Sequence, residues 1–155
     1  MATFLVGKGD FARPVRFDRT HGKLGEAAGQ SFKVGAVLVL SGGKLTKGVT
    51  GSKLNIPGIA AEAASGVTDD KRLIYLADEN AEFVMRVADT QALALAQIGT
   101  SYGLVLDATN DIFRVDTTDT TNVAVKVVEL LDAVGDVNGR VVVKFLNASR
   151  LPQAS

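Results

Sequence analysis

The chain of 155 residues has no cysteine, no tryptophan and a single histidine, His21. The lack of cysteine excludes disulfide frameworks, thiolate nucleophiles and Cys-ligated metal sites. One histidine cannot build a histidine-based metal site or an oriented catalytic base by itself. Unbroken apolar runs such as Ala36–Leu40 are far shorter than the roughly 18 residues of a membrane span, and Gly7–Asp10 interrupts any signal-peptide core. We therefore expect a soluble, unprocessed protein with no membrane partner.

Charge of either sign is not in excess overall, because 17 Lys and Arg balance 17 Asp and Glu. The distribution is uneven: residues 1–53 hold nine basic and three acidic residues, whereas residues 54–120 hold four basic and eleven acidic ones. This asymmetry suits a protein that meets charged neighbours, either copies of itself or one repeated partner surface. Solvated surface explains each single charge equally well. Clustered basic residues with stacking aromatics are missing, so we expect no nucleic-acid partner.

The clearest structural pattern runs from Asp116 to Phe145. Two apolar runs, Val123–Leu131 and Val141–Leu146, flank the turn-rich segment Asp132–Gly139. Both runs alternate and are rich in β-branched residues, which is typical of strands with one apolar face. The pattern predicts a β-hairpin.

The same reasoning predicts further hairpins and single elements along the chain. The expected hairpins are Ser31–Leu40 with Lys44–Val49, Arg72–Ala77 with Glu82–Ala88, and Tyr102–Leu106 with Ile112–Val115. Ile59–Ala63 is expected as a short strand, and Thr90–Gly99 as the one helix, although its alternation leaves a strand open. No repeat of twenty to fifty residues is evident. The fold class predicted is all-β: a small antiparallel β-barrel or sandwich of about eight or nine short strands with one short helix.

The first thirty residues differ in composition from the rest. They combine several glycines and Pro14 with isolated phenylalanines among basic side chains, and they follow no strand or helix period. This predicts an extended N-terminal arm over residues 1–30, a β domain over 31–147 and a C-terminal tail over 148–155. An ordinary first strand at Thr3–Val6 followed by a long loop remains the alternative.

Short motifs give no chemical site. Gly99–Gly103 matches the G-x-S-x-G nucleophile pattern, but the expected helix precedes it, a strand follows it, and the only histidine comes earlier in the chain. We therefore predict no catalytic, cofactor-binding or metal residue, no cofactor, and no enzymatic activity. A weak surface calcium site using the acids of two turns stays open beside the simpler interpretation that they cap those turns: Asp116, Asp119, Asp132 and Asp136.

Taken together, four stretches of the sequence resemble the capsid decoration (cement) proteins of tailed bacteriophages. They are Phe32–Val49, Ile74–Val87, Ile98–Asp107 and Asp116–Leu146, so the resemblance covers most of residues 32–146. It rests on hairpin and turn patterns rather than on a catalytic motif.

The resemblance implies a virion protein on the outer surface of the capsid. Such proteins are β-barrels or sandwiches that clamp neighbouring major capsid subunits, often as a homotrimer and sometimes as a dimer, with an arm that docks on the shell. On this hypothesis the arm supplies the capsid contacts: Phe4, Phe11, Arg13, Pro14, Arg16, Phe17 and Arg19. Rival hypotheses are a small-molecule-binding β-barrel carrier, and another virion component such as a tail or head-fibre domain.

Overall fold

The computed structural model describes residues 12–16 and 20–151, with the backbone alone for Arg16 and Thr20–Lys23. This part of the chain forms eleven β-strands and one short 3-10 turn, η2 (Leu95–Gln97). The strands are β1 (Arg13–Arg16), β2 (Thr20–Gly25), β3 (Val37–Ser41), β4 (Lys44–Lys47), β5 (Gly58–Ala60), β6 (Lys71–Leu76), β7 (Glu82–Arg86), β8 (Ser101–Asp107), β9 (Ile112–Asp116), β10 (Val125–Leu130) and β11 (Arg140–Phe145).

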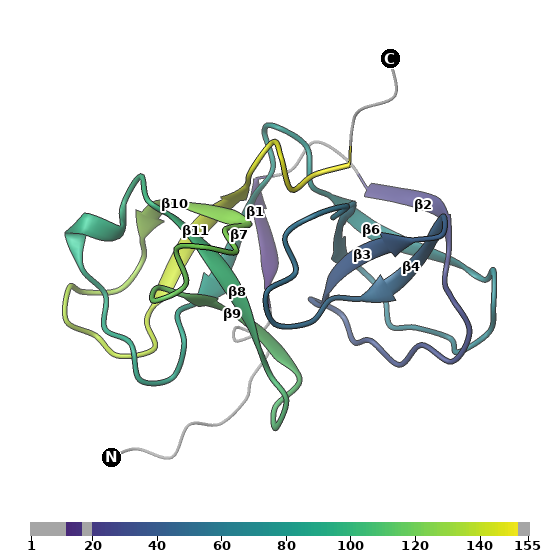
Figure 1. Cartoon of the computed structure of the whole chain (residues 1–155), viewed down its shortest axis with the longest axis horizontal. Helices are drawn as coiled ribbons and strands as arrows, with labels where there is room; N and C mark the ends of the chain where they lie inside the picture. The colour runs from purple at the N-terminus through teal and green to yellow at the C-terminus, as the bar shows by residue number, and fades with distance from the viewer. Residues whose placement is uncertain (1–11, 17–19, 152–155) are drawn as a thin grey trace.

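The strands form two antiparallel sheets that lie beside each other (Figure 1). We call the six-stranded sheet, towards the left in Figure 1, the rear sheet; its strand order is β1-β7-β11-β10-β8-β9. We call the five-stranded sheet, towards the right, the front sheet; its strand order is β2-β6-β5-β3-β4. The predicted all-β class is confirmed. The architecture is sandwich-like, since neither sheet closes into a barrel within the described residues.

Three of the predicted hairpins are confirmed: β3 with β4, β8 with β9, and β10 with β11. Their turns carry the residues that a tight reversal requires. Gly42 and Gly43 both have positive φ, 56° and 79°, as a two-residue turn with right-handed strand twist demands. The strand before that turn begins only at Val37, because Gly35 (φ 89°) lies in a preceding turn.

The predicted hairpin between Arg72–Ala77 and Glu82–Ala88 is wrong. Both strands exist, but β6 pairs with β2 and β5 in the front sheet, whereas β7 pairs with β1 and β11 in the rear sheet. Asp78 forms a compact turn between them, its carboxylate accepting the backbone N–H groups of Asn80 and Ala81. Such a turn reverses a hairpin or passes a chain between sheets equally well.

The predicted helix over Thr90–Gly99 is also wrong; only η2 is helical. The backbone there bonds to a distant loop: Leu93 donates to Asp136 O at 2.9 Å, and Ala92 bridges Val137. These long-range bonds replace the local ladder of a helix, so tertiary pairing overrides a modest propensity.

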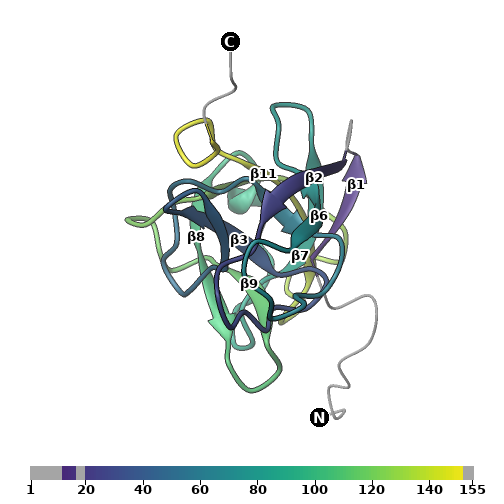
Figure 2. The ribbon, with the colours of Figure 1, turned by 90° about the vertical axis from the view of Figure 1, so that its right-hand side faces the viewer.

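The arm boundary at residue 30 requires correction. Residues 13–16 form β1 on the edge of the rear sheet, and residues 20–25 form β2 on the edge of the front sheet (Figure 2). Edge strands need only one apolar face and tolerate proline and charged residues. These two segments therefore lack the regular alternation by which a strand is recognised in a sequence. The predicted end of the β domain at residue 147 also lies too early in the chain, because the Ile56 N–H donates to Ser149 O and Ile56 forms a bridge with Arg150.

Apart from β1, the two sheets have the same topology. In each, the first strand in the chain pairs with the fifth, followed in order by the fourth, second and third. The residue after the first strand makes a parallel bridge to the third strand, Glu26 to Leu45 in front and Val87 to Val115 at the rear. Gly35 and Gly99, both with positive φ, donate to Ala60 O and Val127 O at equivalent positions. The domain is therefore an internal structural duplication.

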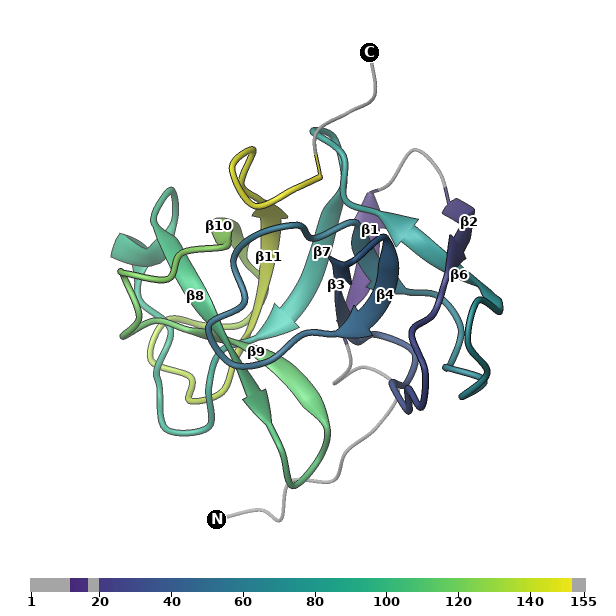
Figure 3. The ribbon, with the colours of Figure 1, turned by 45° about the vertical axis from the view of Figure 1, so that its right-hand side comes forward.

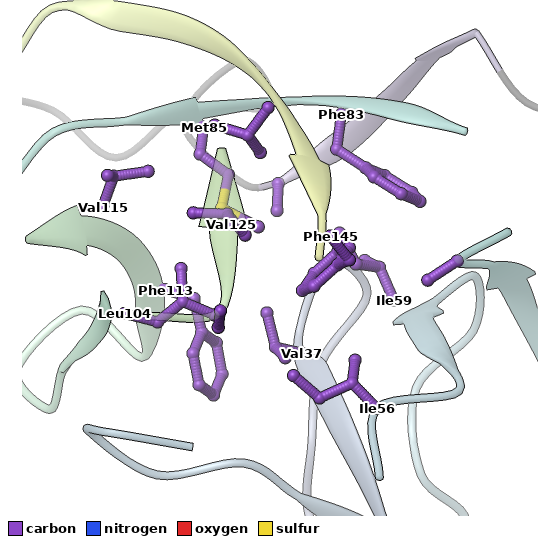
Figure 4. Close-up of a cluster of buried hydrophobic side chains, with 14 of the residues drawn as sticks. Val37, Ile56, Ile59, Phe83, Met85, Leu104, Phe113, Val115, Val125 and Phe145 are labelled. Carbon is purple, nitrogen blue, oxygen red and sulfur yellow. The ribbon is translucent and has the colours of Figure 1, made fainter. Parts of the chain in front are cut away.

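The core lies between the inner faces of the two sheets. Phe83 and Phe145 of the rear sheet meet edge to face, with centroids 5.5 Å apart, and Val37 and Ile59 of the front sheet lie beside Phe145 (Figure 4). All four are at least 96% buried. Each such side chain contributes about 1.5–3 kcal/mol on burial, so the joint core holds the two sheets together.

A second contact joins the sheets through the β4–β5 loop, which reaches across to β8 (Figure 3). Gly51 donates to Leu104 O at 2.9 Å, and the Leu106 N–H donates to the Thr50 hydroxyl at 3.0 Å. Lys53 also donates to Asn122 at 3.1 Å. The two sheets thus share polar as well as apolar contacts.

Gly58 supplies a test of this packing. A Cβ at Gly58 would lie 2.0 Å from the backbone oxygen of Tyr75 in the neighbouring strand, which cannot yield without breaking the ladder. We expect Gly58→Ala to lower the free energy of unfolding by about 3 kcal/mol, measured by urea unfolding. The control Gly42→Asn should be nearly neutral, since asparagine tolerates positive φ; an equally small effect at both sites would contradict the close approach.

Candidate interaction surface

The predicted capsid contacts are only partly within the described structure. Arg13 and Pro14 belong to β1, where they lie opposite Val84 and Phe83 of β7, and the backbone of Arg16 lies opposite Glu82. The remaining contacts of that prediction lie outside the described residues: Phe4, Phe11, Phe17 and Arg19. The structure thus brings three of the predicted residues together as an edge strand and leaves their contact role a prediction.

The outer face of the rear sheet carries like charges opposite one another. Lys126 lies opposite Lys144, and Arg140 lies opposite Arg86, an arrangement that destabilises a sheet unless it is compensated. Asp132 compensates the arginine pair: its carboxylate accepts Arg140 Nη2 at 2.7 Å and the Arg140 backbone N–H at 2.8 Å. The side-chain bond from Arg140 outweighs partial burial and lowers the pKa of Asp132 from 3.8 to about 2.

Exposed aliphatic side chains gather at one end of the rear sheet. Two loops form this end, residues 87–100 and 131–139, which we call the rear tip. Of the twelve large exposed apolar side chains in the described part of the chain, five lie on the rear tip. They are Leu95, Ile98, Leu131, Val134 and Val137. A group of exposed apolar side chains on the loops at one end of a domain is typical of a site of interaction with another molecule.

Backbone bonds tie the two loops of the rear tip together. Gly135 donates to Leu93 O at 2.8 Å, and Leu93 donates to Asp136 O at 2.9 Å. The buried Leu93 side chain lies over Gly139, where a Cβ would come within 2.5 Å of it. Gln97 Nε2 donates to Ala92 O at 2.9 Å. The tip is therefore fixed in advance, which lowers the ordering cost of binding.

The G-x-S-x-G match lies in a strand. Ser101 is the first residue of β8 and lies opposite Lys126 in the ladder, whereas a nucleophile elbow lies between a strand and a helix. His21 belongs to β2 in the other sheet. Gly103 packs closely against the Asp119 carboxylate, which a Cβ at this position would displace.

The turn acids that leave a weak calcium site open in the sequence accept hydrogen bonds from nearby backbone N–H groups. Asp116 accepts the Thr118 N–H at 3.0 Å, and Asp119 accepts the Asn122 N–H at 2.8 Å. The bond from Asn122 holds the pKa of Asp119 below its usual value. Over residues 12–16 and 20–151, no group of three or more His, Asp or Glu side chains is placed to hold a metal ion. The same residues include no helix long and apolar enough to cross a bilayer.

Removing the Asp132 carboxylate tests the role of its pair with Arg140. A depressed pKa stabilises the fold above the unfolded pKa near 4, and this stabilisation is lost as pH falls towards 2. We expect Asp132→Asn to lower the free energy of unfolding by about 1–2 kcal/mol at pH 7, after allowance for partial exposure. The deficit should vanish by about pH 2 in urea titrations; a deficit independent of pH would contradict the pairing, and Asp136→Asn is the control.

Comparison with family models, with curated proteins and with solved structures gave no match to this chain. A functional argument therefore depends on the exposed surface and on the strand arrangement. The rear tip, rigid and aliphatic, is the strongest candidate for a functional surface in the described residues.

Proposed function

We propose that this protein is a non-enzymatic virion protein that binds the outer surface of an assembled phage head and stabilises it by clamping neighbouring major capsid subunits. The observation that carries the proposal is the rear tip. Leu95 is 69% exposed and Val137 is 59% exposed, on loops whose backbones are already bonded to each other. A rigid apolar surface favours docking on another protein.

The body of the protein also supports an interaction role over that of a carrier. The inner faces of both sheets are filled by each other's side chains, including Phe83, Met85 and Phe113. A carrier would instead keep space between its sheets for the ligand. A packed sandwich with binding loops at its ends is suited to holding partners at a fixed separation.

The proposal includes residues 1–11 as a second attachment. They precede β1, so they join the domain at the edge of the rear sheet. Phe4 and Phe11 would dock on the shell, while Arg13 and Arg19 would meet acidic groups of the capsid. Assembly into a homotrimer, or a dimer, would multiply weak contacts into firm binding.

Charged substitutions on the rear tip test the docking surface. We expect Leu95→Asp combined with Val134→Asp to weaken binding to undecorated heads at least tenfold, because two aliphatic contacts would become buried charges. Binding is measured by co-sedimentation of the purified protein with heads made without it. Both side chains are exposed, so the stability of the free protein should change little.

Leu54→Asp is the matched control. Leu54 is 56% exposed, close to the 57% of Val134, but it lies in the β4–β5 loop away from the rear tip. The control should bind heads as the unaltered protein does. Equal loss in both variants, or none in the rear-tip variant, would contradict docking through this surface.

Deletion of residues 2–11 tests the arm separately. The deletion must end before β1, because removal of β1 and β2 would strip an edge from each sheet. We expect the truncated protein to keep its thermal unfolding midpoint within a few degrees and to lose at least tenfold in head binding. Unchanged head binding would show that Phe4 and Phe11 are not used as capsid contacts.

A further inference from the structure

The strand β1 is the one strand of the described residues that has no counterpart in the other half of the duplication. It pairs with β7, with Arg13 opposite Val84 and Arg16 opposite Glu82, and so covers the outer edge of the first strand of the rear half. The first strand of the front half is β2, which stands at the end of its sheet and pairs with β6 alone within the described residues. The rear half therefore shows what the edge of β2 lacks, namely a short antiparallel strand.

The two edges can be aligned through the residues that follow each strand. Ala27 and Ala88 each donate at 2.9 Å to the third strand of their own half, so they occupy equivalent positions. Residues 82–84, which β1 covers, precede Ala88 by four to six positions. The same count back from Ala27 gives residues 21–23, which are thus the uncovered part of β2.

An uncovered edge presents backbone groups to any extended segment that can reach it. Alternate residues of an edge strand turn their N–H and C=O groups outwards, and this row is a template for a further strand. The ladder between β2 and β6 shifts register between His21 and Leu24, and that between β1 and β7 shifts between Pro14 and Arg16. Because β1 pairs with β7 despite its shift, an irregularity of this kind is compatible with a short added strand.

The chain itself contains a segment suited to this edge. Outside the described ranges, Thr3–Val6 is the one stretch rich in β-branched and aromatic residues, which favour strands. It is four residues long, the same length as β1. Gly7 and Gly9 follow it and end the pattern.

The edge of a second copy is easier for this segment to reach than the edge of its own β2. Residues 17–19 join the end of β1 to the start of β2, so these two strand ends lie within about 14 Å of each other. Thr3–Val6 precedes β1 and joins the domain at its other end, about 10 Å along the strand. A course to its own β2 would have to turn back along the whole of β1, whereas pairing with a neighbouring copy requires no such reversal.

We propose that Thr3–Val6 of one copy adds as an antiparallel strand to the outer edge of β2 in a second copy, at residues 21–23. The inference rests on the proposed function for its homo-oligomer and names the contact that holds that oligomer together. If each copy gives one strand and receives one, the exchange closes into a dimer or a trimer. Backbone groups make the contact, so the Phe4 side chain stays on one face of the added strand and remains available to the shell.

A proline substitution tests the exchange in the full chain. Leu5→Pro removes a backbone N–H and blocks the ladder, so we expect the variant to be monomeric. Lys8→Pro is the matched control, because it introduces the same residue between Gly7 and Gly9, outside the added strand. Light scattering should give the Leu5→Pro variant the mass of one chain, 16.2 kDa, and should give the unaltered protein and the control a whole multiple of it.

Hydrogen exchange of backbone amides locates the contact. In the unaltered protein, residues 20–25 should exchange at least tenfold more slowly than in the Leu5→Pro variant at the same concentration, because the added strand protects their outward N–H groups. Residues 82–86 serve as the internal reference, since β1 covers their edge in both proteins.

Each outcome bears on the inference. A monomeric unaltered protein or an oligomeric Leu5→Pro variant would overturn it, and protection of β2 in a monomer would show that the segment pairs within its own chain. Equal exchange at residues 20–25 in both proteins would also overturn it, because the contact would lie elsewhere. Binding to heads is measured alongside: a monomeric protein that binds heads would overturn the exchange alone, whereas an unaltered protein that does not bind heads would overturn the proposed function.

Discussion

The fold depends on the contact between the inner faces of two small sheets. A single sheet leaves its apolar face open to water unless another layer packs on it, and here each sheet packs on the other. Phe145 of the rear sheet lies against Ile59 of the front sheet, and one continuous core spans both. This contact also holds the rear sheet, with the rear tip at its end, in place on the rest of the domain.

Local sequence patterns predicted the elements whose partners are close in the chain. The hairpins at Gly42-Gly43 and around Asp132–Gly139 could be recognised because turn residues separate two alternating runs. The separation of β6 from β7 could not, since the Asp78 turn serves either connection. The helix predicted at Thr90–Gly99 failed because Leu93 bonds to a loop some forty residues later. The duplication is not evident as a repeat of twenty to fifty residues, because each half spans more than fifty residues, from Thr20 to Leu76 and from Glu82 to Phe145.

The candidate surface was less predictable than the fold. Leu95 and Val137 lie in segments for which the sequence predicts a helix and a turn, and hydrophobicity alone does not reveal which apolar residues stay exposed. The predicted contact residues Arg13 and Pro14 became part of a sheet edge, because an edge strand accepts proline and charge. Long-range pairing decides these features, and only the structure displays it.

The central proposal is that the protein docks on an assembled head through its rear tip. A cryo-electron microscopy reconstruction of heads decorated with the full-length protein tests it most directly. The account predicts that Leu95 and Val134 of the rear tip contact a capsid subunit. Density in which the rear tip projects into solvent would contradict it.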